Sequence, residues 1–193
     1  MTPAPVTPTE VLRFWFGETP TAAPRDAWFR KDAAFDAAIR ARFGATVDRA
    51  LAGGLQDWAA TPADALARIL VLDQFTRNTS RGTARAFAGD ALALAAAEDL
   101  VADGRHLRLA PMQRWFAYLP FEHAEDLAVQ QQSLQLFGAL AAEHPALAEA
   151  QVWAVKHADV IRRFGRYPHR NALLGRVSTA AELDFLAQPG SSF

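Results

Sequence analysis

The chain has 193 residues, of which 51% are hydrophobic, and its net charge is −1. This length and composition fit one globular domain, and a charge near zero favours neither nucleic acid nor an anionic membrane as a partner. The sequence contains no cysteine, which excludes disulfides, thiolate catalysis and metal sites with cysteine ligands. It shows no signal-peptide pattern and no apolar run near the ~20 residues that span a bilayer, so we expect a cytoplasmic protein.

Helix signals recur along the chain, whereas strand and hairpin signals are rare. Thr7-Pro8-Thr9-Glu10 is a capping box with proline at the first helical position, and it predicts a helix that ends at Gly17. Apolar residues at four-residue spacing predict a helix over 35–51, and Thr61-Pro62 begins a third helix that runs to about Thr76. Further helices are expected at about 87–103, from Pro111 to Pro120, and at about 124–142, 145–164 and 179 onward.

Short connections between these helices favour antiparallel neighbours in a bundle or a stack of helical hairpins. The sequence therefore predicts an all-α fold with a single domain over residues 1–193. Its ends, at about 1–6 and 188–193, have the composition of short disordered segments.

Polar residues interrupt the apolar stripes of these helices at three places. Asp73 follows Leu66, Ile69 and Leu70 on one face, His157 lies within the face of Trp153 and Ile161, and Gln131 falls between Leu127 and Leu134. A carboxylate on such a face must be hydrogen-bonded, ion-paired, protonated or part of a cavity lining. One interpretation is a structural tie, in which Asp73 is paired with Arg77 or Arg81; the other is a functional site.

Two polar stretches lie at helix boundaries and supply further candidates. The first, Pro120–Asp126, places Glu122 beside His123. The second, Arg162–Asn171, continues past the expected helix end with Arg166, His169, Arg170 and Asn171. These side chains would either fasten their loop to Asp73 or Glu122, or form a pocket for an anion.

Several reaction classes find no support in the residue spacing. The Glu-x-x-His of di-iron bundles, His-Glu-x-x-His, the phosphate-binding Gly-x-x-x-x-Gly-Lys and Gly-x-Ser-x-Gly are all absent. No metal and no cofactor is therefore predicted. Acid–base work by histidine and carboxylate remains compatible with the residues present.

Five motifs follow one another along the chain: Leu72–Asn78, Arg81–Phe87, Pro120–Glu125, Phe164–Asn171 and Leu174–Thr179. In these motifs and over the span from Val11 to Glu182, the sequence resembles the bacterial family called domain of unknown function 924. It implies a fold similar to the tetratricopeptide-like superhelix of antiparallel helix pairs, but no agreed activity or catalytic residue. The family's recognisable motifs coincide with the polar stretches, which is a reason to treat them as one assembled site or one shared structural network.

The leading hypothesis is an internal site for a small anionic or polar ligand. If it is catalytic, His123 or His169 would be the acid–base group, and a neighbouring carboxylate, Glu122 or Asp73, would orient it. Arginines and polar groups would bind the ligand: Arg81, His157, Arg163, Arg166, Arg170 and Asn171.

Two alternatives remain beside this hypothesis. The first is a peptide-binding scaffold with exposed Trp15, Trp28, Phe29 or Trp58 as anchors and the polar motifs as internal ties. The second is a homo-oligomer subunit that associates through its helical faces.

Overall fold

In the computed structural model, residues 5–18 and 25–191 are described, and within these ranges the chain forms helices and no strands. The α-helices are α1 (Pro8–Phe16), α2 (Asp26–Phe29), α3 (Ala33–Leu51), α4 (Pro62–Leu70), α5 (Thr76–Thr79), α6 (Asp90–Ala102), α7 (Pro111–His123), α8 (Leu127–Glu143), α9 (Ala148–Phe164) and α10 (Ala180–Leu186). A π-helix, η2 (Val71–Phe75), joins α4 to α5, and 3₁₀ turns connect other helices: η1 (Gln56–Ala59), η3 (Ala84–Phe87), η4 (Arg105–Arg108), η5 (Pro145–Leu147) and η6 (Pro168–Arg170).

The prediction of an all-α, single-domain fold is confirmed. The capping boxes at Thr7 and Thr179 form as expected, and each threonine side chain accepts a backbone N–H three residues later. The tetratricopeptide-like arrangement stays a prediction. Of the predicted chain ends, residues 1–4 and 192–193 lie outside the described ranges, while Val6 packs against the core.

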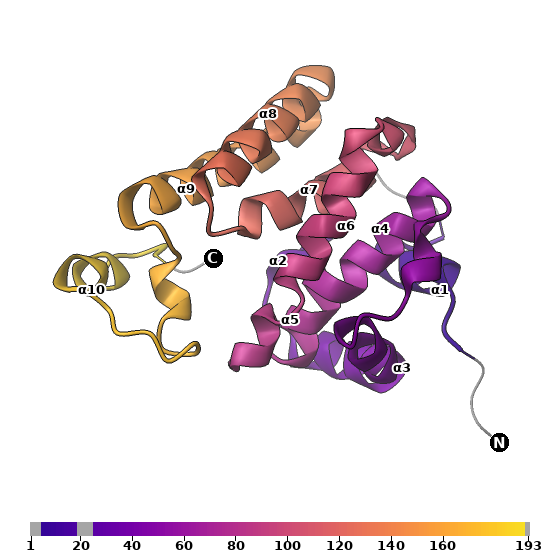
Figure 1. Cartoon of the computed structure of the whole chain (residues 1–193), viewed down its shortest axis with the longest axis horizontal. Coiled ribbons are helices and arrows are strands. Elements are labelled where there is room, and N and C mark those ends of the chain that lie inside the picture. Colours follow the sequence, from indigo (N-terminus) through magenta and orange to yellow (C-terminus); the bar gives the residue numbers. More distant parts are fainter. Residues whose placement is uncertain (1–4, 19–24, 192–193) are drawn as a thin grey trace.

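The core lies where α1, α3 and α7 surround α4 and η2 (Figure 1). Aromatic residues fill it: Trp15 contacts Phe75 and Phe116 with ring centroids 5.6 and 5.5 Å apart. Trp28 packs on Trp15 and Phe116, and its indole N–H donates to the Trp15 carbonyl oxygen at 3.0 Å. This packing buries a large apolar area and satisfies the Trp28 polar group at the same time.

The predicted exposed tryptophan anchors are therefore wrong. The exposed fractions of Trp15, Trp28 and Trp58 are 0%, 8% and 4%. All three side chains belong to the hydrophobic core cluster. The side chain of Phe29 lies outside the described residues.

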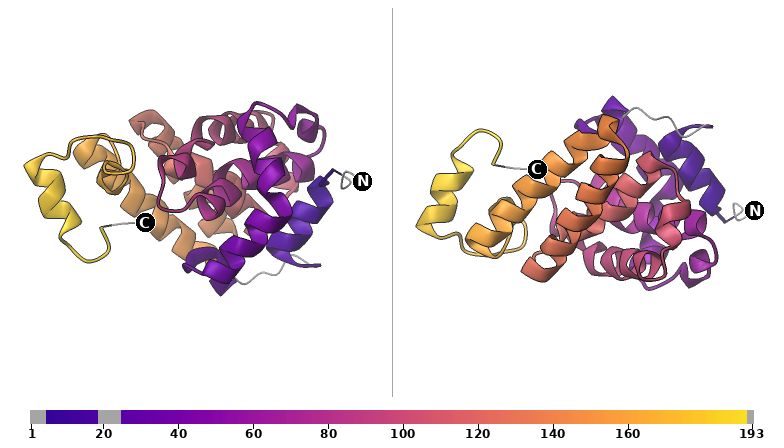
Figure 2. Two further views of the ribbon diagram at one scale, coloured as in Figure 1. Left: turned by 90° about the horizontal axis from the view of Figure 1, so that it is seen from below. Right: turned by 90° about the horizontal axis from the view of Figure 1, so that it is seen from above.

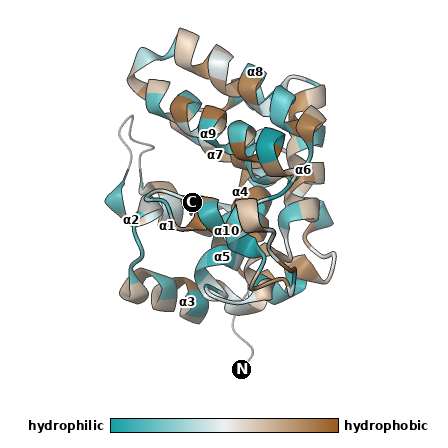
Figure 3. Cartoon of the chain, turned by 90° about the vertical axis from the view of Figure 1, so that its left-hand side faces the viewer, coloured by the Kyte–Doolittle hydropathy of each residue, from teal (hydrophilic) through white to brown (hydrophobic). Residues whose placement is uncertain are grey.

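A second layer is formed by α7, α8 and α9, in which α8 and α9 pack along each other as a helical hairpin. Figure 3 shows hydrophobic and hydrophilic residues alternating along these helices, as expected for amphipathic helices. Both views of Figure 2 place α10 at one end of the molecule, beyond α9. In the described residues, no helix is long and apolar enough to cross a bilayer.

Two details of the predicted helices are corrected. Pro120 does not end its helix, because α7 continues through it to His123. Gln131 is exposed, and the buried glutamine is Gln130, which is 2% exposed. Its Nε2 lies 3.2, 2.8 and 2.8 Å from the carbonyl oxygens of Phe121, Glu122 and Ala124, so it stabilises the turn that follows the proline.

The π-helix η2 is closely packed against the start of α6. The Thr76 hydroxyl donates to the Val71 carbonyl oxygen at 3.0 Å, which satisfies a backbone acceptor five residues earlier. Gly89 lies so near that a Cβ atom added there would be 2.1 Å from the Leu72 carbonyl oxygen. Glycine is required at this position because only hydrogen fits, and the contact places Asp90, the first residue of α6, beside η2.

Candidate functional site

The π-helix carries Asp73 into a buried position, with an exposed fraction of 0%. His123, the last residue of α7, places its Nδ1 2.7 Å from Asp73 Oδ1. Arg77, one turn after Asp73, donates from Nη1 to the same oxygen at 2.9 Å, and Gln74 also donates to the carboxylate. The predicted tie between Asp73 and Arg77 is thus present, and the same carboxylate holds a histidine.

The charge states of this group follow from its surroundings. Burial alone raises the pKa of Asp73, but Arg77 and His123 hold it well below its ordinary value, so the carboxylate is ionised. Burial and the Arg77 charge lower the pKa of His123 below its ordinary 6.5, against the attraction of Asp73. A neutral His123 then donates its Nδ1 proton to Asp73 and keeps a lone pair on Nε2.

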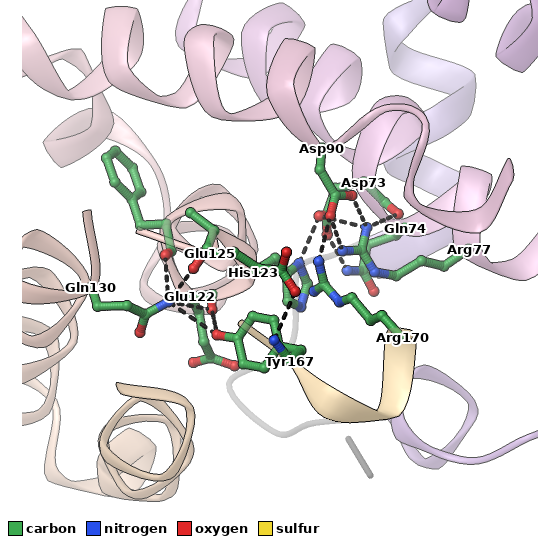
Figure 4. A network of polar contacts seen from close by, with 12 residues as sticks. Asp73, Gln74, Arg77, Asp90, Glu122, His123, Glu125, Gln130, Tyr167 and Arg170 are labelled. Atoms are coloured by element: carbon green, nitrogen blue, oxygen red, sulfur yellow. Dashed lines mark hydrogen bonds and ion pairs between the residues drawn. The ribbon is translucent and has the colours of Figure 1, made fainter. Parts of the chain in front are cut away.

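Asp90 and Arg170 extend the network from α6 and η6 (Figure 4). Arg77 pairs with Asp90 at 3.0 Å, and Arg170 Nη1 pairs with Asp90 Oδ2 at 3.1 Å. The Arg170 guanidinium also lies over the rings of Phe87 and Tyr167, 4.7 and 4.5 Å from their centroids. Arg170 therefore joins the site as predicted, but through Asp90, which the stripe pattern had not indicated.

A second acid–histidine pair lies behind the first. His157 Nδ1 donates to the Trp153 carbonyl oxygen at 2.9 Å and lies 3.3 Å from Glu122 Oε1. Glu122 is 3% exposed, and its Oε2 has no hydrogen-bond partner among the described residues. Burial, together with the Asp73 charge, raises the pKa of Glu122 to about 8, whereas burial and the influence of His123 lower that of His157 to about 3. Both groups are therefore mainly uncharged at pH 7.

Tyr167 and Gln130 connect this second pair to the C-terminal segment. The Tyr167 hydroxyl donates to the Glu122 carbonyl oxygen at 2.5 Å and accepts from Gln130 Nε2 at 3.0 Å. The Tyr167 backbone N–H donates to Glu125 Oε1 at 2.7 Å, and Arg176 pairs with the same carboxylate. Direct hydrogen bonds thus join the Pro120–Asp126 stretch to the Arg162–Asn171 stretch.

The remaining predicted residues divide between the site and its surroundings. His169 lies beside Tyr167, with ring centroids 5.7 Å apart, and burial and Arg170 lower its pKa to about 4. Asn171 is 1% exposed and donates to Ser178 Oγ at 3.0 Å, which fixes the C-terminal loop.

Three predicted arginines lie apart from the Asp73 network. Arg81 pairs with Asp36 of α3 at 2.7 Å. Arg166 pairs with Glu182 of α10 at 2.6 Å, so it fastens α10 rather than Asp73 or Glu122. Arg163 lies over the ring of Phe164, 4.7 Å from its centroid. Arg163 and Arg166 border a pocket of about 560 Å³ with Glu182 on its wall.

The network is electrically balanced and partly open to solvent. Its three ion-paired carboxylates, Asp73, Asp90 and Glu125, meet three guanidinium groups, those of Arg77, Arg170 and Arg176. The side chains of His123, Arg77 and Asp90 are 14%, 19% and 21% exposed. Solvent therefore reaches the edge formed by α5, α6 and the end of α7, while the Glu122 side is closed. No group of three or more histidine, aspartate or glutamate side chains among the described residues could hold a metal ion.

Asp90, Gln130 and Tyr167 are the principal members that sequence reasoning did not assign. Asp90 is the first residue of a helix, where an acidic side chain is expected because it interacts favourably with the helix dipole. Gln130 is adjacent to the predicted Gln131, so a shift of one residue in the helix register separates them. Tyr167 lies within the predicted Arg162–Asn171 stretch, but the residue pattern does not distinguish it from an aromatic residue of the core.

The fold and the site together describe an all-helical protein with a buried acid–histidine network. The chain belongs to the family described as bacterial protein of unknown function (DUF924), whose model matches residues 11–190. It is similar to a solved structure titled protein of unknown function ATU0120 from Agrobacterium tumefaciens, with 38% identity and a TM-score of 0.81. The match covers 93% of this chain and 96% of that one. A search of curated proteins finds no match.

Proposed function

We propose that the edge formed by Asp73, His123 and Arg77 is an acid–base site for a small polar molecule. The observation that carries the proposal is the 2.7 Å contact between His123 Nδ1 and the ionised, fully buried Asp73. The His123 side chain is nevertheless 14% exposed. A carboxylate that fixes the tautomer and orientation of an imidazole is the arrangement by which many enzymes prepare a general base.

The roles follow from the charge states. His123 Nε2 accepts a proton from the bound molecule, and Asp73 stabilises the imidazolium that forms. Arg77 and Arg170 border the same edge and stabilise negative charge that develops on the molecule. Because the ion pairs balance, a neutral polar substrate that becomes anionic during reaction suits the site better than a multiply charged anion.

Thermal-shift and native mass spectrometry screens against polar metabolites test this proposal. We expect a stabilising ligand whose effect is lost in His123→Gln, and a turnover assay with that ligand gives a rate that the substitution lowers by about 10²–10⁴-fold. The matched control is His144→Gln, which changes a histidine that is 39% exposed on its side chain and lies outside the network. A ligand response that both variants retain, or no response across the panel, would contradict the proposal.

A second candidate is the peptide-binding scaffold, now without its tryptophan anchors. The observation that favours it is the exposure of Val152, Trp153 and Val155 on α9, at 52%, 38% and 41%. A partner captured by the wild type and His123→Gln but lost in Trp153→Ala would support it. The same mass spectra give the oligomeric state and so test the predicted self-association.

A further inference from the structure

A pocket of about 350 Å³ lies at the far end of α6 from the acid–histidine network. Asp90 and Asp99 are separated by nine residues of this helix, which is about 14 Å along its axis. The pocket is formed by α4, α6, η1 and η4, and its wall contains four alanines, an indole and four charged side chains: Ala59, Ala65, Ala96, Ala102, Trp58, Arg68, Asp99, Asp103 and Arg105. Its size is at the lower end of the range for small-molecule sites.

Arg68 is the unusual member of this wall. It is 9% exposed, yet no described residue forms an ion pair or a hydrogen bond with its guanidinium, and its Nε is buried without a partner. The comparably buried Arg114 and Arg170 both have carboxylate partners, Glu143 and Asp90. Its buried Nε lacks an acceptor, and its two Nη atoms, which are not buried, are free to bind a molecule in the pocket, so we expect the missing acceptor to come from outside the chain.

The other charges of the pocket do not supply this acceptor. Asp103 pairs with Arg105 at 2.6 Å, and Arg105 also donates to the carbonyl oxygens of Ala59 and Asp99. Asp99 lines the pocket without forming an ion pair with Arg68. The two arginines and two aspartates of the wall sum to zero charge, so a dianion such as phosphate is disfavoured more strongly than a singly charged anion that pairs with Arg68.

We propose that this pocket binds a small organic monocarboxylate. Its two carboxylate oxygens pair with the planar fork of Arg68, and its apolar part packs against Trp58 and the alanines. The site is separate from the proposed acid–base site, so each can be tested while the other is left intact.

Pairs of molecules that differ mainly in charge test the proposal. We expect benzoate to raise the unfolding midpoint by several degrees at saturation, whereas its neutral counterpart benzamide has no effect. The midpoint shifts with acetate and propionate, at matched ionic strength, show how large an apolar group the ligand needs for binding. Arg68→Met abolishes the benzoate shift, and the exposed Arg108→Met, which changes an arginine of the neighbouring η4, retains it. His123→Gln also retains it, which separates this result from that of the acid–base site.

The ligand-free variants provide a second readout. Because Arg68 has no partner, Arg68→Met is expected to unfold at the same temperature as the wild type or higher. A midpoint lower by several degrees would show that Arg68 has a structural role instead, and would overturn the proposal. Equal shifts with benzoate and benzamide, a shift with phosphate but with no carboxylate, or no shift at all would do the same. Calorimetric titration of the wild type with benzoate and benzamide decides the question if Arg68→Met does not fold, and Arg68→Lys then tests the need for the fork.

Discussion

The two acid–histidine pairs of this protein use similar residues, but the carboxyl group is ionised in one pair and protonated in the other. Asp73 and His123 are a carboxylate with a neutral imidazole at an edge that solvent reaches, and Arg77 lies against the carboxylate. Glu122 and His157 are a protonated acid with a neutral imidazole in a closed interior. In the chain, Glu122 and His123 are adjacent, so sequence position does not explain the difference.

The guanidinium explains it. A carboxyl that is taken out of water stays ionised only if an opposite charge replaces the lost hydration. Arg77 provides that charge for Asp73, while the negative Asp73 is itself the charge that Glu122 senses. Burial, reinforced by the ionised Asp73, keeps Glu122 protonated, and the two pairs form one electrostatic unit.

Removing the charge of Asp73 is expected to have the largest effect. Asp73→Asn keeps the side-chain shape but leaves the buried Arg77 paired with the partly exposed Asp90 and His123 without an ionic acceptor. We expect the free energy of unfolding to fall by about 3–5 kcal/mol, measured by urea denaturation at pH 7. The control is Asp184→Asn, at an exposed position of α10. A loss below about 1 kcal/mol would contradict the importance of this ion pair.

Glu122→Gln tests the protonated state of Glu122 through the pH dependence of stability. The folded-state pKa of Glu122 is raised to about 8 from 4.5, so its contribution to stability is fully present below pH 4.5 and is lost as the pH rises towards 8. Glutamine does not titrate, so the variant should gain roughly 3 kcal/mol on the wild type between pH 5 and pH 8. The lowered pKa values of Asp73 and His157 make both proteins less stable as the pH falls, which is the opposite of the Glu122 effect. The difference between the two unfolding free energies removes this shared contribution.

Unfolding measured at each pH gives this difference directly. Glu149→Gln, an exposed position at the start of α9, is the matched control and should show no such divergence. Parallel stability curves for the wild type and Glu122→Gln would mean that Glu122 is ionised in the folded protein.

Gly89→Ala is expected to disturb the Asp73 network through a change in the backbone. The added Cβ would lie 2.1 Å from the Leu72 carbonyl oxygen, so α6 must shift away from η2. This shift would separate Asp90 from Arg77. A loss of about 2–3 kcal/mol is expected in thermal or urea unfolding. Gly138→Ala in α8 is the control, because its Cβ meets only Gln151 Nε2 at 3.6 Å, and it should stabilise by about 0.5–1 kcal/mol. Similar effects in both variants would rule out the close approach as the cause.

Tyr167→Phe should have the smallest effect, on the Glu122 side. It removes a hydrogen bond to the Glu122 carbonyl oxygen, but Gln130 Nε2 still donates to that oxygen at 2.8 Å. We expect a loss of about 1–2 kcal/mol with the pH dependence of Glu122 unchanged. An altered pH dependence would show that the hydroxyl acts on the carboxyl and not only on the backbone.

Much of the helical anatomy follows from local rules. The capping boxes at Thr7 and Thr179, the proline after Thr61 and the glycine after Phe16 act within one turn of the chain, so their effect can be predicted without the fold. Pro120 shows where such rules fail. Its cost to the helix is local, but the donor that stabilises the following turn, Gln130, comes from another helix.

The all-helical class, the family and the polar stretches could be predicted from the sequence, because periodicity and motif order are properties of neighbouring residues. The sequence also placed Asp73 and His157 on buried faces. The contact of Asp73 with His123, the pairing of Arg81 and Arg166 with Asp36 and Glu182, and the burial of Trp15, Trp28 and Trp58 became visible in the folded chain. The physical reason is that a side chain's charge and exposure depend on groups brought near it from distant parts of the chain.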